Sequence, residues 1–425
     1  MPGLVDTHIH ASQYSYAGTA LDLPLLQWLT TYTFPVESQY TDLEFARRVY
    51  TQVVKRTLRN GTTTACYFAT IHTDASLLLA QIANDFGQRA LVGKVCMDRN
   101  GALEHYKEGT QESLDETSRF IRELLKRKYL LVKPVMTPRF AVSCSGELLL
   151  KLSEIAKNNN LHIQSHISET KEEVKLVKQL FPDLETYTDV YNEHNLLTDK
   201  TIMAHGCHLS DKELELFHKK GTSLAHCPNS NISYVHGSIY PYQTFAQHTA
   251  TALAYGSDLS SIYLSVCLCL NAYYVETTYN VEMQWLCSGL LDVHKVLSHK
   301  VKLGLGTDVA GGYSASMLDA VRRARDTSKA LTIMDPTRVP LTFEETFRLA
   351  TLGGSQALSM DGQTGNFEVG KDFDALRVNV AVPDGPIDLV QYDGPKILLE
   401  KFLNMGDDRN ILEVYVAGRK VVPIE

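Results

Sequence analysis

The sequence lacks long hydrophobic runs and any concentration of basic residues. Its longest apolar stretch, residues 262–275, is shorter than the roughly 20 residues that a membrane-spanning helix needs, so we expect no transmembrane segment. The 41 Lys and Arg residues are scattered and are outnumbered by 49 Asp and Glu, which argues against a nucleic-acid-binding surface. The first residues contain no basic segment followed by an apolar one, as a secretion signal requires.

Several sequence motifs are also absent. The eight cysteines show no paired metal-binding spacing and lie mostly within apolar runs, which is typical of buried thiols in a reducing, cytosolic compartment. There is no glycine-rich nucleotide fingerprint, no Walker loop and no G-x-S-x-G nucleophile elbow. The H-x-E and P-C-x-x-C signature of zinc deaminases acting on cytosine and adenine is missing too. The absent motifs argue against enzymes that bind dinucleotides or nucleoside triphosphates through these loops, against α/β-hydrolases, and against deaminases with the P-C-x-x-C zinc site.

Short β-branched segments alternate with amphipathic ones through most of the chain, such as the helical pattern over 113–128 with Phe120, Leu124 and Leu125 on one face. Eight segments are predicted to be strands: 3–10, 62–70, 90–97, 130–138, 161–168, 201–207, 223–228 and 301–308. Eight strands separated by helices predict an α/β fold, a TIM-type (β/α)8 barrel.

The last part of the chain departs from this rhythm. Residues 341–359 are predicted to be helical, and the segments after them predict two or three strands. We therefore expect a barrel domain over 2–365 and a small β appendage over 366–425. Residues 235–286, rich in Tyr, Ser and Thr but without a clear period, are too long for an ordinary loop. They are interpreted as a lid, an insertion or an error in the gene model.

Polar, metal-competent residues lie at the ends of several predicted strands. His8 and His10 share a strand face because side chains two apart point the same way. His166, His205 and Asp308 lie at the ends of the fifth, sixth and eighth strands. Since strand ends share one rim of a barrel, these residues predict one N/O metal site suited to zinc, with iron as the alternative. A pair of satisfied core histidines is the alternative for the first two residues taken alone.

Four further residues are placed to act on a substrate. Glu169, three residues after His166, is off the ligand register and so is placed to move protons, although a first-turn helix Glu is the simpler interpretation without the ligands beside it. The Arg139 guanidinium matches the O6/N7 edge of guanine, and Phe140 can stack on a planar base. Gln13 lies three residues past His10. A surface arginine paired with a helix carboxylate is the commoner fate of such a residue.

Nine segments resemble one known family. They are PGLVDTHIHASQYS, NGTTTACYFATIH, TPRF, HIQSHISE, MAHG, AHCPNSN, GLGTDVAGG, LATLGGSQAL and GNFEVGKDFDA. Over nearly all of residues 2–234 and 287–425 the chain resembles animal guanine deaminases of the metal-dependent amidohydrolase superfamily. The resemblance implies hydrolysis of guanine to xanthine and ammonia by a cytosolic homodimer.

The resemblance also implies roles for individual residues. One zinc ion per subunit is expected to be held by His8, His10, His166, His205 and Asp308. Glu169, Asp308 and His205 are the expected catalytic residues. Guanine is expected to contact the six residues Gln13, Arg139, Phe140, His166, Glu169 and Asp308.

The chain departs from its relatives in two places. They carry several dozen residues before the first strand, so we expect an incomplete β-sandwich with an unpaired edge over 375–380. Residues 235–286 have no counterpart. Two alternatives to a guanine deaminase stay open: a hydrolase of a related heterocycle such as a pterin or triazine, and a catalytically impaired variant that acts only as a binding protein.

Overall fold

The structure of the protein, a computed structural model, describes residues 1–21, 23–100, 106–233, 288–391 and 394–424. These described residues belong to one compact unit, so the domain boundary between residues 365 and 366 stays a prediction. The predicted insertion over 235–286 lies outside the described residues. None of the described helices is long and apolar enough to cross a bilayer.

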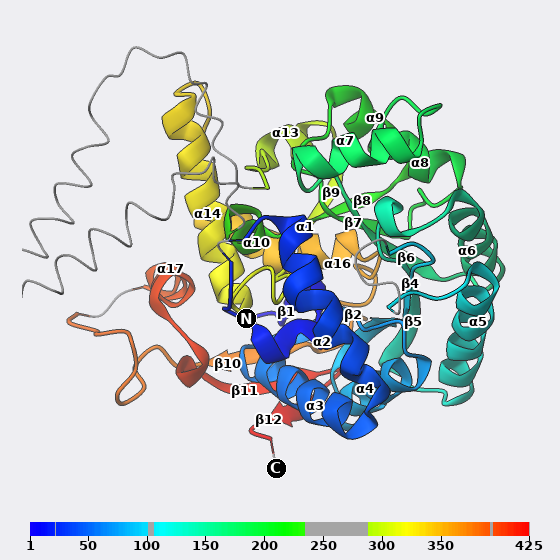
Figure 1. Ribbon diagram of the computed structural model, residues 1–425. Helices are drawn as coiled ribbons and strands as arrows, with labels where there is room; N and C mark the ends of the chain where they lie inside the picture. Colours follow the sequence, from blue (N-terminus) through cyan, green and yellow to red (C-terminus); the bar gives the residue numbers. More distant parts are fainter. Residues whose placement is uncertain (22, 101–105, 234–287, 392–393, 425) are drawn as a thin grey trace, which may run out of the picture. The chain divides into compact units, whose positions relative to one another are not determined.

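A parallel sheet of the predicted strands forms the barrel (Figure 1). Its strands are β1 (Leu4–His10), β2 (Thr62–Phe68), β3 (Arg89–Gly93), β4 (Val95–Cys96), β5 (Val132–Pro138), β6 (His162–Ile167), β7 (Thr201–His205), β8 (Ser223–His226) and β9 (Lys302–Leu305). They pair in chain order except at β4: β3 pairs directly with β5, and β4 pairs with β5 beyond the end of β3. Nearly all their residues are buried, because helices cover the outer face and side chains fill the interior. The predicted TIM-type barrel is confirmed.

The third predicted strand, over 90–97, is divided at Lys94. The ammonium of this buried lysine donates to the Val95 carbonyl oxygen at 3.1 Å and to Glu108 Oε2 at 2.8 Å. A buried lysine is stable only when its charge is paired and its donors are used. Its hydrogen bonds therefore accompany the break between β3 and β4.

Backbone and side-chain hydrogen bonds join the first strand to the segment after the last. The Asp308 N–H donates to the His8 carbonyl oxygen at 2.9 Å, and the His10 N–H donates to the Val309 carbonyl oxygen at 3.1 Å. The buried Asp6 carboxylate accepts from the Thr307 hydroxyl at 2.6 Å and from the Thr307 N–H at 3.0 Å. This closure brings residues 300 positions apart in the chain to one rim.

Helices occupy the connections between strands and the segments after them (Figure 1). They are η1 (Ala11–Tyr16), α1 (Leu25–Trp28), η2 (Leu29–Thr33), α2 (Phe34–Glu37), η3 (Ser38–Thr41), α3 (Leu43–Arg59), α4 (Thr73–Asp85), α5 (Thr110–Lys126), η4 (Ala141–Ser143), α6 (Gly146–Asn158), α7 (Lys171–Leu180), α8 (Tyr187–Glu193), α9 (Asp211–Lys220), α10 (Pro228–Ser233), α13 (Val293–Ser298), α14 (Met317–Met334), α15 (Phe343–Arg348), η6 (Leu349–Gly353), α16 (Gly354–Ala357), α17 (Pro395–Met405) and η7 (Asp408–Asn410). In α5, Phe120 and Leu124 are buried, but Leu125 is 49% exposed. Its predicted place on the buried face is wrong, because consecutive helix residues point about 100° apart.

The appendage contains an antiparallel sheet of β10 (Ala375–Val378), β11 (Ile411–Val416) and β12 (Arg419–Val422). The prediction of an unpaired edge over 375–380 is wrong in part. The Leu376 N–H donates to the Met1 carbonyl oxygen at 2.8 Å, and the Gly3 N–H donates to the Asp374 carbonyl oxygen at 3.0 Å. The first residues of the chain thus occupy this edge, since the groups of an open strand are satisfied by any extended segment beside them.

A buried ion pair joins the barrel to the small sheet. Arg89, only 2% exposed, lies 3.2 Å from Asp374 and 2.7 Å from Asp372. We expect Arg89→Met to lower the free energy of unfolding by about 3–5 kcal/mol, because it leaves the buried Asp374 carboxylate without its cation. Urea unfolding followed by circular dichroism measures this change; a loss below about 1 kcal/mol would contradict the prediction.

Candidate metal centre and active site

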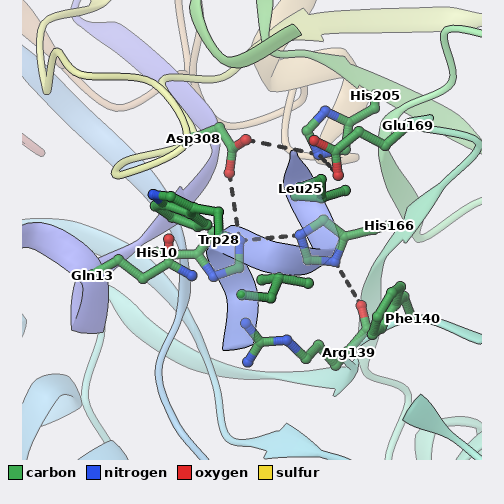
Figure 2. Close-up of a pocket in the computed structure, with 12 residues that line it drawn as sticks. His10, Gln13, Leu25, Trp28, Arg139, Phe140, His166, Glu169, His205 and Asp308 are labelled. Atoms are coloured by element: carbon green, nitrogen blue, oxygen red, sulfur yellow. Dashed lines mark hydrogen bonds and ion pairs between the residues drawn. The ribbon is translucent and has the colours of Figure 1, made fainter. Parts of the chain in front are cut away.

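Five of the predicted residues converge at the carboxyl ends of the barrel strands, and Figure 2 shows four of them, His10, His166, His205 and Asp308. His8 and His10 come from β1, His166 from β6 and His205 from the end of β7, while Asp308 follows β9. The donor atoms of His8, His10, His166 and Asp308 all lie within 4.8 Å of one another. A second such group joins His205 and Asp308 with Cys227.

The distances between donor atoms suit a shared metal ion. His8 Nε2 lies 3.1 Å from Asp308 Oδ1, and His10 Nε2 lies 3.4 Å from the same oxygen. His10 Nε2 and His166 Nε2 are 3.0 Å apart. Two ligands of one zinc ion, each about 2 Å from it, are separated by roughly 3–4 Å. The spacing of these atoms therefore fits a metal centre.

Hydrogen bonds on the far side of two rings leave their Nε2 lone pairs free to bind a metal. The Nδ1 atom of His166 lies 2.6 Å from the Arg139 carbonyl oxygen, and that of His205 lies 2.8 Å from Asn231 Oδ1. Each acceptor requires Nδ1 to carry a proton. In the neutral form of the ring, which is the form that binds a cation, the lone pair then lies on the Nε2 atom that points into the site. His8 Nε2 is buried and lies 3.1 Å from the Asp308 carboxylate. A cation bound between the imidazole nitrogens and this carboxylate would satisfy both kinds of donor atom.

Electrostatics favour the metal-binding protonation states of His8, His10, His166 and Asp308, whereas the pKa of His205 is raised, because the Glu169 and Asp308 carboxylates outweigh the effect of its burial. Burial lowers the pKa of His8, His10 and His166, which keeps these imidazoles neutral. Burial opposes the charge of Asp308, but the hydrogen bond from His8 and the surrounding imidazoles hold the pKa of this carboxyl well below its usual range. A neutral histidine and an ionised aspartate are the ligand forms of these side chains.

Backbone strain accompanies two of these residues. His205 has φ +74° and Asp308 has φ +48°, both in the left-handed region that residues with a side chain rarely adopt. Such conformations cost about 1–3 kcal/mol each and persist where the surrounding structure imposes them, often at functional sites. Nearby, a Cβ on Gly312 would lie 2.2 Å from the Thr307 carbonyl oxygen, which explains the glycines beside Asp308 as a close backbone approach.

Glu169 faces the same centre. Its Oε2 lies 3.4 Å from His205 Nε2, and the Ser288 hydroxyl is 3.5 Å from its Oε1. Burial raises the pKa of this carboxyl, so that it can hold a proton near neutral pH. Glu169 is not a first-turn residue of α7, because it precedes the helix and the capping box is formed by Thr170 and Glu173. The Glu169 side chain is therefore free to exchange protons.

Gln13, Arg139 and Phe140 line the pocket beside the metal centre (Figure 2). Arg139 is buried, and it is paired with a carboxylate that our sequence analysis did not identify: its Nη1 lies 2.6 Å from Glu37 Oε2. The Phe140 ring lies 6.4 Å from that of His166. Arg139 is therefore not a surface residue. Its partner Glu37 does belong to a helix, as that alternative expected.

Three apolar residues complete the pocket and were also missed. Leu25, Trp28 and Leu29, from α1 and η2, line it opposite the polar groups. Their segment LPLLQWL has the composition of any buried helix, so no signal in one sequence separates it from core. They give the pocket the apolar wall that excludes water and accepts a planar ring.

His226, the last residue of β8, and Asn231, in α10, have different surroundings. Asn231 holds His205, whereas His226 is fully buried, lies outside the pocket lining, and neither ring nitrogen has a hydrogen-bond partner. Burial lowers the pKa of His226 to about 3, which keeps it neutral. Asn231 is therefore the one of these two residues that can orient a metal-binding ring.

The chain is similar to known proteins over its whole length. A model of the amidohydrolase family, which is metal-dependent, matches residues 1–421. The chain is 54% identical to the guanine deaminase of Homo sapiens, over 100% of this chain and 83% of that protein. It is 43% identical to the guanine deaminase of Dictyostelium discoideum, over 99% and 82% respectively.

A solved structure supports the same grouping. The guanine deaminase from C. acetobutylicum, whose crystal structure has guanine bound in the active site, superposes with a TM-score of 0.81. The two sequences are 32% identical, and the match covers 99% of this chain and 86% of that one. The chain therefore belongs to the amidohydrolase family and, within that family, groups with the guanine deaminases.

Proposed function

We propose that this protein is a metal-dependent enzyme that hydrolyses guanine to xanthine and ammonia. The observation that carries the proposal is the shared pocket: the His and Asp cluster, Glu169 and the Arg139 guanidinium all face one cavity. The similarity to guanine deaminases over the whole chain supports the same substrate. Neither related-heterocycle hydrolysis nor a purely binding role is favoured by a specific observation.

We propose zinc as the metal, held by His8, His10, His166, His205 and Asp308. Imidazole and carboxylate donors suit this ion. When bound, zinc acidifies water, so that a hydroxide nucleophile is available near neutral pH. Metal analysis of the purified protein by mass spectrometry tests this choice, and iron in place of zinc would contradict it.

Glu169 and Asp308 move the protons of the reaction in this proposal. Asp308 accepts a proton from the attacking water, because its carboxylate stays ionised. Glu169 gives a proton to the purine ring nitrogen as C2 is attacked. Asp308 then gives its proton to the amino group, which leaves as ammonia. The new C2 hydroxyl returns its proton to Glu169, which leaves the C2 carbonyl oxygen of xanthine and restores both carboxyl groups. His205 Nε2 lies 3.4 Å from Glu169 Oε2, so the carboxyl that moves the proton lies beside the proposed metal centre.

Arg139, Gln13 and Phe140 orient the base. With the O6/N7 edge of guanine on the Arg139 guanidinium, C2 lies on the opposite side of the purine and faces the metal centre. Phe140 supplies a ring beside the base plane. Adenine carries its amino group at the edge that Arg139 would bind, where a donor meets a donor, so the arrangement favours guanine.

Conversion of guanine by the purified protein tests the proposal directly. We expect metal-loaded protein to release xanthine and ammonia in equal amounts, measured by chromatography and an ammonia assay. Folded, metal-loaded protein that releases no ammonia from guanine would contradict it. The same assay with a pterin and a triazine as competitors distinguishes the related-heterocycle alternative.

Asn231→Ala is expected to weaken metal binding about 10–100-fold. Asn231 Oδ1 accepts from His205 Nδ1 at 2.8 Å and so fixes the ring's tautomer and orientation. Competition with a fluorescent chelator measures the affinity. Asn229→Ala, which changes an amide in the same helix that instead bonds Asp319, is the control; an equal loss in both variants would contradict the role of Asn231.

The family resemblance also predicts properties of the whole protein. We propose that it works as a homodimer in the cytosol. Analytical ultracentrifugation and imaging of the tagged protein in cells test the two parts separately.

A further inference from the structure

Glu37 is a fully buried carboxylate beside the substrate pocket. It ends helix α2, and its two oxygens are surrounded by donors of four residues from three other parts of the chain. Oε2 accepts from Arg139 Nη1 at 2.6 Å and from the Tyr106 hydroxyl at 2.7 Å. Oε1 accepts from Arg139 Nη2 at 3.3 Å, Gln13 Nε2 at 3.2 Å and the Ser12 hydroxyl at 3.4 Å.

These five donors occupy the acceptor positions of the carboxylate. A carboxylate offers about four lone pairs, so Glu37 has none left for a ligand. It is also not among the residues that line the pocket, whereas Arg139 and Gln13 are. Glu37 therefore acts on a ligand only through those two residues.

The Arg139 guanidinium is held in one orientation by this contact. Both terminal nitrogens face Glu37, and the guanidinium carbon lies 5.0 Å above the centre of the Phe34 ring. A planar guanidinium paired through two nitrogens keeps its remaining N–H groups in fixed directions. Those remaining donors are the ones that can reach a base in the pocket.

The Gln13 carboxamide is fixed by the same carboxylate. Its Nε2 donates to Glu37, while its Oε1 accepts from the Ala310 N–H at 3.1 Å. A carboxylate accepts only and an N–H donates only, so the amide cannot be reversed without losing both bonds. Glu37 thus sets which end of Gln13 is available to a ligand.

We propose that Glu37 is a positioning residue that determines selectivity for purines with a 6-oxo group, by aiming the donors of Arg139 and Gln13. The proposal rests on the proposed function for the identity of the substrate. It assigns Glu37 no contact with the base or the reacting atoms. Without its charge, Arg139 is a buried cation free to adopt other orientations.

Equilibrium binding of two purines tests this role without turnover. Hypoxanthine keeps the 6-oxo edge of guanine but lacks the 2-amino group that would be released; 6-methylpurine has a methyl group in place of the oxygen. Isothermal titration calorimetry of the full-length, metal-loaded protein measures both. We expect wild type to prefer hypoxanthine, and Glu37→Gln to lose at least about tenfold in hypoxanthine affinity and under about twofold for 6-methylpurine.

Two further variants keep the test decisive. Tyr106→Phe retains the charge of Glu37 and removes one bond to it, so a smaller loss in the same direction is expected even if Glu37→Gln folds poorly. Asp374→Asn neutralises a different buried carboxylate paired with an arginine, and is expected to lower Tm while leaving selectivity unchanged.

Some results would overturn the inference. These are wild type binding both purines equally, Glu37→Gln keeping its discrimination, or an equal loss for both ligands. Wild type that discriminates between the purines but releases no ammonia from guanine would contradict the proposed function and leave the role of Glu37 supported.

Discussion

Glu169→Gln is expected to lower kcat for guanine by about 10²–10⁴-fold, the range in which a positioned general acid or base contributes. The amide keeps the shape of the carboxyl group, so the pocket is preserved, but it cannot exchange the proton that the ring nitrogen and the leaving amine need. Steady-state kinetics at saturating guanine measure the effect. KM is expected to change little, because the substitution removes proton transfer and leaves the base contacts in place.

Glu172→Gln is the matched control for this substitution. It makes the same chemical change in the first turn of α7 and is not among the residues that line the pocket. We expect its kcat to stay within about twofold of wild type, as surface substitutions usually have small effects. Equal losses in both variants, or a Glu169→Gln variant with full activity, would contradict the assignment of Glu169.

His8→Ala is expected to empty the metal centre and to reduce activity more than about 100-fold, beyond the usual effect of losing a residue that merely orients a ligand. The substitution removes one nitrogen of the proposed ligand set, while the Asp308 carboxylate that His8 faces keeps the imidazoles of His10 and His205 nearby. Inductively coupled plasma mass spectrometry of the purified variant measures bound metal. Added zinc is expected to raise the Tm of wild type and not that of the variant, because binding to the native state stabilises it by mass action.

His226→Ala is the control for His8→Ala. It removes a buried imidazole from a strand of the same barrel. Neither nitrogen of this ring has a hydrogen-bond partner among the described residues, and His226 lies in neither metal-competent group. We expect lower stability from the cavity but a full complement of metal. Retention of stoichiometric metal by His8→Ala would contradict the proposed ligand set.

The strand-end residues were accessible to sequence reasoning because parallel strands impose a common rim. Once eight strands were counted, His166, His205 and Asp308 had to lie at the same end of the barrel as His10. Two local predictions differ from the structure. The third predicted strand is divided at Lys94, which forms a buried ion pair with Glu108, and Leu125 is exposed on α5.

The residues around Arg139 were not accessible in the same way. Glu37, Tyr106 and Trp28 lie in segments whose composition resembles ordinary helix or loop, and no spacing rule connects them to position 139. Their contacts exist because the segment between β1 and β2 lies across the end of the barrel, and a single sequence carries no record of that path. Likewise, the pairing of Met1 with the β10 edge is a contact between opposite ends of the chain.

The sequence by itself determined the barrel, the metal-competent residues and the resemblance to the guanine deaminases, because each depends on local periodicity or on short motifs. The tertiary structure decided which groups face the nitrogens of each imidazole, which carboxylate holds Arg139, and which side chains line the pocket. These properties depend on atoms within about 4 Å of one another that are tens to hundreds of positions apart in the chain. Electrostatics and hydrogen bonding act over such distances in space, and only the folded chain brings those atoms together.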